Sequence, residues 1–109
     1  AMIATSLFWS VKDRSIQTSM QSDLRSAATQ QEIYFAYHNQ YAPSAAHLTD
    51  FAPSPGVVLT VTYSARNGWA GTTTHPTAAG AQCGLAVNAA PTASAPPATI
   101  QGVIACTQP

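Results

Sequence analysis

The three histidines are the side chains in this 109-residue sequence best suited to bind a metal or to move a proton. His38, His47 and His75 are not arranged in an HxxxH or HExxH pattern, the spacing that brings two histidines to one helix face. The nearest carboxylates, Glu32 and Asp50, stand six and three positions from a histidine. We therefore interpret the histidines as surface or capping residues, and we expect neither a metal nor a cofactor.

The serines do not form a recognisable nucleophilic site. No Gly-x-Ser-x-Gly turn is present, and the four carboxylates leave few candidates for the acid of a triad. No glycine-rich phosphate-binding loop occurs in the sequence either. The sequence therefore predicts that the protein is not an enzyme.

The two cysteines, Cys83 and Cys106, could react with each other, and neither belongs to a CxxC or Cys/His array. An even number of cysteines in a small domain with a thin core indicates a disulfide, formed in an oxidising compartment. A bridge across this span would contribute about 3 kcal/mol in the chain-entropy model. Two reduced, buried thiols are the alternative.

The composition provides little core material and almost no charge. Alanine accounts for 21 of the residues, the formal net charge is zero, and no residue from Asn67 to Pro109 is charged. Because such a surface has no basic patch, we expect contact with neither nucleic acid nor anionic lipid headgroups. A net charge near zero also favours self-association.

The elements that must position these side chains begin with one long helix. From Ala1 to about Asn39 the chain has no proline or glycine, and apolar residues recur at helical spacing. At ~1.5 Å per residue such a helix would be roughly 60 Å long, about twice the diameter of a small domain. We expect residues 1–42 to form the helical part, with residues 1–15 protruding. The residues expected to pack the helix on the sheet are Ile16, Met20, Leu24, Tyr34 and Phe35.

The protruding part is apolar nearly all round. It reads AMIATSLFWSV and ends at the charged run Lys12-Asp13-Arg14. It is too short to cross a bilayer, which takes about 20 residues, and it lacks the basic start and the cleavage site of a signal peptide. We interpret it as the end of a longer hydrophobic helix.

Residues 43–109 are predicted to form a loop and a small antiparallel sheet of about four strands, which gives an α+β fold. Within the loop Ser44–Gly56, a short turn at His47, Leu48 and Phe51 is expected to pack back on the helix.

The first two strands are predicted to form a hairpin. The residues that alternate on one face of the first strand are Val57, Leu59, Val61 and Tyr63. Asn67-Gly68 is predicted to supply the positive φ angles of the turn, and Trp69 to His75 form the return strand. This register would place Arg66 opposite Trp69, on the face away from the helix, where a cation–π contact could form.

Two further strands complete the predicted sheet. The third runs from Cys83 to Asn88 and the last from Thr99 to Cys106, separated by an irregular Pro/Ala loop from Ala89 to Ala98. The residues expected on one face of the third strand are Cys83, Leu85 and Val87, and those expected inward on the last are Ile100, Ile104 and Cys106.

In this order of elements the chain resembles a bacterial type IV pilin or the similar pseudopilin of type II secretion. The segments that carry the resemblance are AMIA, SLFWSVKDRS, SDLRSAATQQEIYFAYHNQYAPS, GVVLTVTYSARNGWAGTTTHPTAAGAQCG and GVIAC. They span nearly the whole chain and are specific in combination. Pilins begin with an aromatic residue, a short stretch containing glutamate and a long apolar run, so roughly 16 residues are expected to be missing before Ala1. The family's glutamate therefore corresponds to no residue here, and Ser6 stands where many pilins have proline.

The resemblance implies a structural subunit of an extracellular filament at the cell surface. The amino-terminal helix would anchor the subunit in the inner membrane before assembly, and would then pack against identical subunits in a helical polymer built by a pilus assembly machinery. The filament-core contacts expected on this basis are Met2, Ile3, Leu7, Phe8 and Val11.

Two other interpretations concern binding and conduction. A minor pilin, a pseudopilin or a surface binding module would use the loops Pro76–Gln82 and Ala89–Ala98 to contact a sugar, a surface or a protein. The aromatic series at the helix end could form a conducting path, but we interpret it as core packing. The members of that series are Tyr34, Phe35, Tyr37 and Tyr41.

Overall fold

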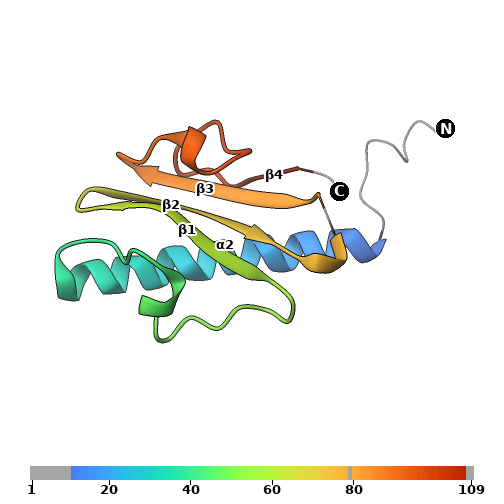
Figure 1. Ribbon diagram of the computed structural model, residues 1–109, viewed down its shortest axis with the longest axis horizontal. Helices are drawn as coiled ribbons and strands as arrows, with labels where there is room; N and C mark the ends of the chain where they lie inside the picture. The colour runs from blue at the N-terminus through green and yellow to red at the C-terminus, as the bar shows by residue number, and fades with distance from the viewer. Residues whose placement is uncertain (1–10, 79, 108–109) are drawn as a thin grey trace.

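The computed structural model describes residues 11–78 and 80–107, with side chains from Arg14 onward. One long helix, α2 (Val11–His38), is followed by four strands: β1 (Val58–Ala65), β2 (Gly68–Thr74), β3 (Gln82–Asn88) and β4 (Ala105–Thr107). The strands pair antiparallel in the order β1-β2-β3-β4. The helix lies along one face of this sheet (Figure 1). The predicted α+β fold, a long helix on a small antiparallel sheet, is confirmed.

The helix continues as far as its sequence allows. Its 28 residues contain no proline or glycine and span about 42 Å. It ends where Asn39 adopts a left-handed conformation with φ of 58°, while the Asn39 N–H still bonds to the Phe35 carbonyl at 2.8 Å. The predicted end near Asn39 is therefore confirmed, and the predicted helical residues 1–10 lie outside the described part of the chain.

The main core fills the space between α2 and the sheet. Its fully buried centre combines Met20 and Leu24 from the helix with Trp69 from β2. Leu48 and Phe51 pack against this core from the loop that follows the helix, as expected, while His47 lies exposed in the short turn η1 (Ala45–His47). The core therefore depends on a few large side chains, as the composition indicates.

The first hairpin differs from its prediction in the position of the turn. Ala65 pairs with Gly68 and Ser64 with Trp69, so the turn consists of Arg66 and Asn67. Among residues 11–78 and 80–107, Asn39 and Asn88 are the non-glycine residues with positive φ, and Gly68 does not have one either. The predicted Asn67-Gly68 turn with positive φ angles is therefore wrong.

The position of Trp69 corrects a second expectation about this hairpin. Trp69 is fully buried and belongs to the core beneath α2, so it does not face away from the helix. Its indole lies across Gly71, where a Cβ atom would come within 2.8 Å of the ring. The predicted pairing of Arg66 with Trp69 is wrong because the turn falls one residue earlier and the indole fills the space above Gly71.

A β-bulge in β1 changes the alternation of that strand. Val61 pairs with Gly71, but Tyr63 pairs with Ala70, so Thr62 is an extra residue. Leu59 faces the helix, whereas Tyr63 packs on the opposite face of the sheet. The expectation that Tyr63 shares the face of Leu59 is therefore wrong.

The opposite face of the sheet has a small core of its own, made almost entirely of alanine. Ala70 of β2 and Ala86 of β3 are buried beneath the loop that follows β3, which contains the short turn η3 (Thr92–Ser94). The loop residues that complete this alanine core are Ala90, Ala95 and Ala98. Figure 1 shows this loop above β3, away from α2. The Ala89–Ala98 segment thus forms a tight layer over the sheet.

The last strand is much shorter than predicted. Regular pairing with β3 is limited to β4, because residues 100–103 form a turn in which Gly102 has φ of 81°. The Gly102 N–H donates to the Ala86 carbonyl at 2.7 Å, which holds this turn against β3. Ile104 packs against the main core, but Ile100 is 60% exposed, so its predicted inward position is wrong.

Candidate functional site

The residues predicted to form filament contacts lie mostly outside the described part of the chain. This applies to Met2, Ile3, Leu7 and Phe8, while Val11 is the first residue of α2 and its side chain is not described. The next residues are described, and none from Arg14 to Ser19 is fully buried. Met20 is the first residue of α2 in the core, so the amino-terminal end of the helix contributes little to the protein's own interior.

The predicted helix contacts with the sheet cluster further along α2. Met20 and Leu24 are fully buried, and Ile16, Tyr34 and Phe35 are partly buried against the same core. Within residues 11–78 and 80–107, no helix combines the length and the apolar character needed to span a membrane.

The predicted disulfide is confirmed. Cys83 and Cys106 are joined by a bond of 2.01 Å and face each other directly in the pairing of β3 with β4. Cys83 is fully buried and Cys106 is partly buried, so the bridge forms part of the main core. The bond ties the short final strand to the centre of the sheet, which three residues of pairing alone would hold weakly.

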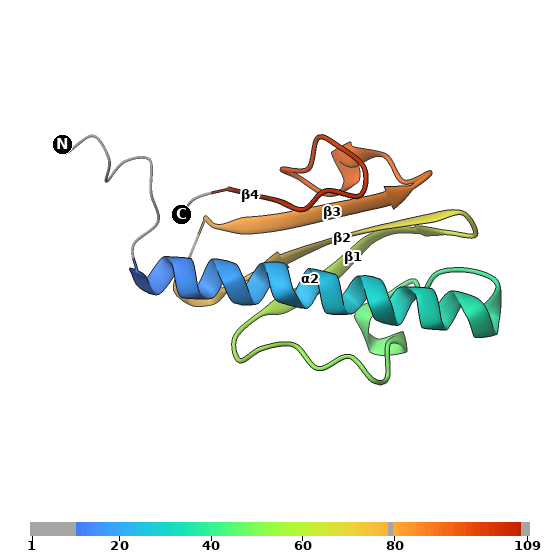
Figure 2. The ribbon, with the colours of Figure 1, turned by 180° about the vertical axis from the view of Figure 1, so that it is seen from behind.

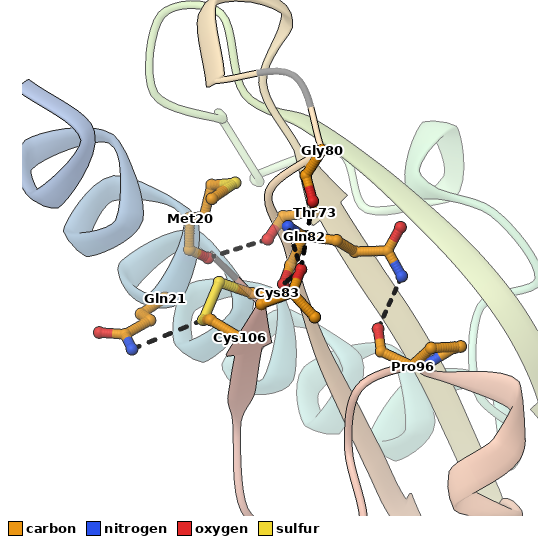
Figure 3. The surroundings of a disulfide bond; sticks show 9 residues. Met20, Gln21, Thr73, Gly80, Gln82, Cys83, Pro96 and Cys106 are labelled. Carbon is orange, nitrogen blue, oxygen red and sulfur yellow. Dashed lines mark hydrogen bonds between the residues drawn. A yellow bond between two sulfur atoms is a disulfide. The ribbon is translucent and has the colours of Figure 1, made fainter. Parts of the chain in front are cut away.

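Polar side chains connect α2 to the strands around the disulfide (Figure 3). The amide of Gln21 donates to Sγ of Cys106 at 3.6 Å, and the Thr73 hydroxyl donates to the Met20 carbonyl at 3.3 Å. On the other side of β3, the amide of Gln82 donates to the Pro96 carbonyl at 2.7 Å. The helix, the sheet and the alanine-rich loop are therefore linked close to the same bridge.

Two polar residues of α2 that sequence reasoning missed hold the chain segment after the helix. Asp23 is buried and accepts hydrogen bonds from the backbone N–H and the hydroxyl of Ser54, at 2.7 and 3.0 Å. Gln31 is fully buried and binds both backbone groups of Ala42, accepting from the N–H at 2.7 Å and donating to the carbonyl at 3.1 Å. Their spacing gave a usable signal, since Gln31 lies four residues after buried Ala27.

A third polar contact involves a residue that we had placed on the solvated face of the helix. The Tyr41 hydroxyl donates to a carboxylate oxygen of Glu32 at 2.9 Å, and the Asn88 amide donates to the same hydroxyl at 3.3 Å. Burial raises the pKa of Tyr41 above its ordinary value of 10.0, and the hydrogen bond and negative charge of Glu32 raise it further. The neutral phenol is therefore the form that suits this network.

An open groove of about 440 Å³ lies between the last turns of α2 and the segment from η1 to Asp50. Tyr34 and Tyr37 line it, together with His38 and His47. Tyr34 is stacked on His38 with ring centroids 3.9 Å apart, and its ring is perpendicular to that of His47 at 6.3 Å. Tyr37 is 82% exposed, so the expectation that it packs in the core is wrong.

The third histidine lies elsewhere and has a structural role. Nδ1 of His75 accepts from the Thr77 N–H at 3.0 Å, and its Nε2 lies 3.3 Å from the Pro55 carbonyl. Among the described residues, no group of three or more His, Cys, Asp and Glu side chains could hold a metal ion.

Compared with models of known protein families and with curated protein sequences, the chain matches none of them. Arguments about its function therefore start from its own residues and their geometry.

Proposed function

We propose that this chain is a structural subunit of a type IV pilus-like extracellular filament and that it polymerises through its apolar amino-terminal segment. One observation carries the proposal: α2 contributes no fully buried side chain to its own core before Met20, yet the sequence ahead of it is apolar nearly all round. A continuous apolar helix of this kind is an aggregation hazard unless partner molecules cover it.

The remaining features suit such a subunit. The disulfide favours an oxidising compartment outside the cytoplasm, and the net charge of zero favours close packing of identical copies. Repeated, non-closing contacts between copies generate a helical polymer. In this proposal an assembly machinery draws the subunits from the inner membrane into the filament.

Binding through the loops Pro76–Gln82 and Ala89–Ala98, as in a minor pilin, a pseudopilin or a surface module, has less support. Ala90, Ala95 and Ala98 of the second loop are buried over the sheet, so much of that loop serves the alanine core.

The proposal predicts that Phe8→Asp abolishes filament formation, because a carboxylate cannot be buried among apolar helices without a partner. Full-length protein would be expressed together with its assembly machinery, and filaments would be counted by electron microscopy. Phe8→Leu is the matched control and should still form filaments. Formation of the Cys83–Cys106 disulfide in both variants would show that the sheet is folded. Normal filaments from Phe8→Asp would contradict the proposed role of this segment.

A further inference from the structure

The groove at the carboxyl-terminal end of α2 exposes aromatic surface that the core does not use. Ile33 is 45% exposed and Tyr37 82% exposed on the helix side of the groove, whereas Leu48 on the opposite side is buried. Figure 2 shows η1 beside this end of α2, far from the start of the helix at Val11. The groove is therefore separate from the apolar segment in the proposed filament contact.

The polar side chains of the groove retain unused hydrogen-bonding groups. Nδ1 of His38 donates to the Tyr34 carbonyl at 3.1 Å, and Nδ1 of His47 lies 2.7 Å from the Ser44 hydroxyl. Nε2 of each ring has no hydrogen-bond partner within residues 11–78 and 80–107.

Three further polar side chains line the groove without using their hydrogen-bonding groups on the protein. They are Gln30, Thr49 and Asp50, none of which has a side-chain partner in the described part of the chain. Amide, hydroxyl, carboxylate and imidazole groups are thus directed at one small space beside the aromatic rings.

The charge of the groove restricts the ligand. None of the described residues that line it is Lys or Arg, and Asp50 is its one carboxylate. Phosphates, other anions and nucleic acid are therefore disfavoured. An ammonium ligand would need rings that enclose it, but the Tyr34 and His38 rings are nearly parallel, 14° apart, and cover each other.

We infer that this groove binds a neutral saccharide of one or two sugar rings. The flat, C–H-rich face of a pyranose packs on an exposed aromatic ring such as Tyr37, while its hydroxyls both donate and accept hydrogen bonds. The groove supplies acceptors in Asp50 and donors or acceptors in Gln30 and the two histidines. Its volume of about 440 Å³ is within the range of small-molecule sites.

The inference is tested by titrating the isotope-labelled 109-residue chain with methyl glycosides of neutral hexoses and N-acetylhexosamines, and with neutral disaccharides. Nuclear magnetic resonance should show saturable shifts of the backbone amides of Ile33, Tyr37 and Thr49, while the amides of Val58 and Ile100 stay in place. Choline chloride and inorganic phosphate serve as charged probes and should produce no such shifts.

Substitutions at Tyr37 make the test specific. Tyr37→Ser should weaken saccharide binding about tenfold or more because the stacking ring is lost, and Tyr37→Trp should retain it. Ile100→Ser removes an equally exposed apolar side chain elsewhere and should leave the affinity unchanged. The inference is overturned if no sugar binds, if the shifts map outside the groove, if choline binds in place of sugars, or if Tyr37→Ser binds as tightly as the parent chain. Because the assay needs no filaments, its result is independent of the proposed polymerisation.

Discussion

Gln31 holds the turn that follows α2 with both ends of its side-chain amide. A neutral amide can satisfy a backbone N–H and a carbonyl at the same time, so Ala42 is buried without an unpaired polar group. Asp23 does the same for Ser54 with its two carboxylate oxygens. These two residues fix the path of the segment after the helix, which places η1 beside the end of α2 and so forms the groove.

Tyr41 gives the protein a predictable response to alkaline pH. Burial and the nearby Glu32 raise the pKa of its phenol above 10.0 in the folded state, whereas the unfolded chain ionises near 10.0. The unfolded state therefore loses this proton first, and the stabilisation that is fully present below pH 10 decreases as the pH rises towards the folded pKa. Urea unfolding of the parent chain at about pH 9 and about pH 11 should show this loss, and Tyr41→Phe should reduce it. An equal loss in both proteins would rule out Tyr41 as its source.

Residue-scale features of this kind were only partly accessible from the sequence. The disulfide could be predicted because two cysteines in a small domain have few alternatives. The roles of Gln31 and Glu32 could not, because their partners, Ala42 and Tyr41, are brought to them only by the turn after the helix. Tyr37 was misassigned for a related reason: a helix has room for aromatic residues on more than one face.

Among the elements, the alanine-rich loop after β3 is the most consequential. Its buried alanines approach β2 and β3 so closely that Gly84 has no room for a side chain. A Cβ atom at this position would overlap the Ala95 carbonyl oxygen and lie 2.7 Å from that of Pro96. Small side chains therefore let the second face of the sheet be covered by backbone.

Gly84→Ala should consequently destabilise the fold by about 2 kcal/mol, because the loop must move away from the sheet. Chemical unfolding in urea measures the free energy of unfolding. The matched control is Gly102→Ala, which has open space around the new Cβ and only the strain of its φ of 81°, so it should cost about 1 kcal/mol. A larger effect at Gly102 than at Gly84 would contradict the tight packing of this loop.

The elements themselves were predicted better than their pairing. The long helix, its end and the four strands follow from local patterns that the chain displays openly. The bulge at Thr62, the early turn at Arg66 and the shortened β4 depend on how Trp69 and Gly102 fit into the assembled sheet. The alanine core was missed because alanine has the same appearance in a packed layer as in a loop.

On the scale of the whole molecule, the two ends of α2 have different environments. The carboxyl-terminal end is held by buried polar contacts and lies beside the groove, whereas the amino-terminal end has no fully buried residue before Met20. The proposed filament uses the second end, and the inferred saccharide site uses the first. A polymer built in this way would display many copies of the groove.

The central claim is that identical copies cover the apolar segment ahead of Lys12. The most direct test is an electron cryomicroscopy reconstruction of the particles formed by the full-length protein. The account predicts a helical filament in which Phe8 and its apolar neighbours from adjacent subunits pack around the axis, with the disulfide-linked sheets outside. A discrete monomer, with that segment folded back on its own sheet, would contradict it.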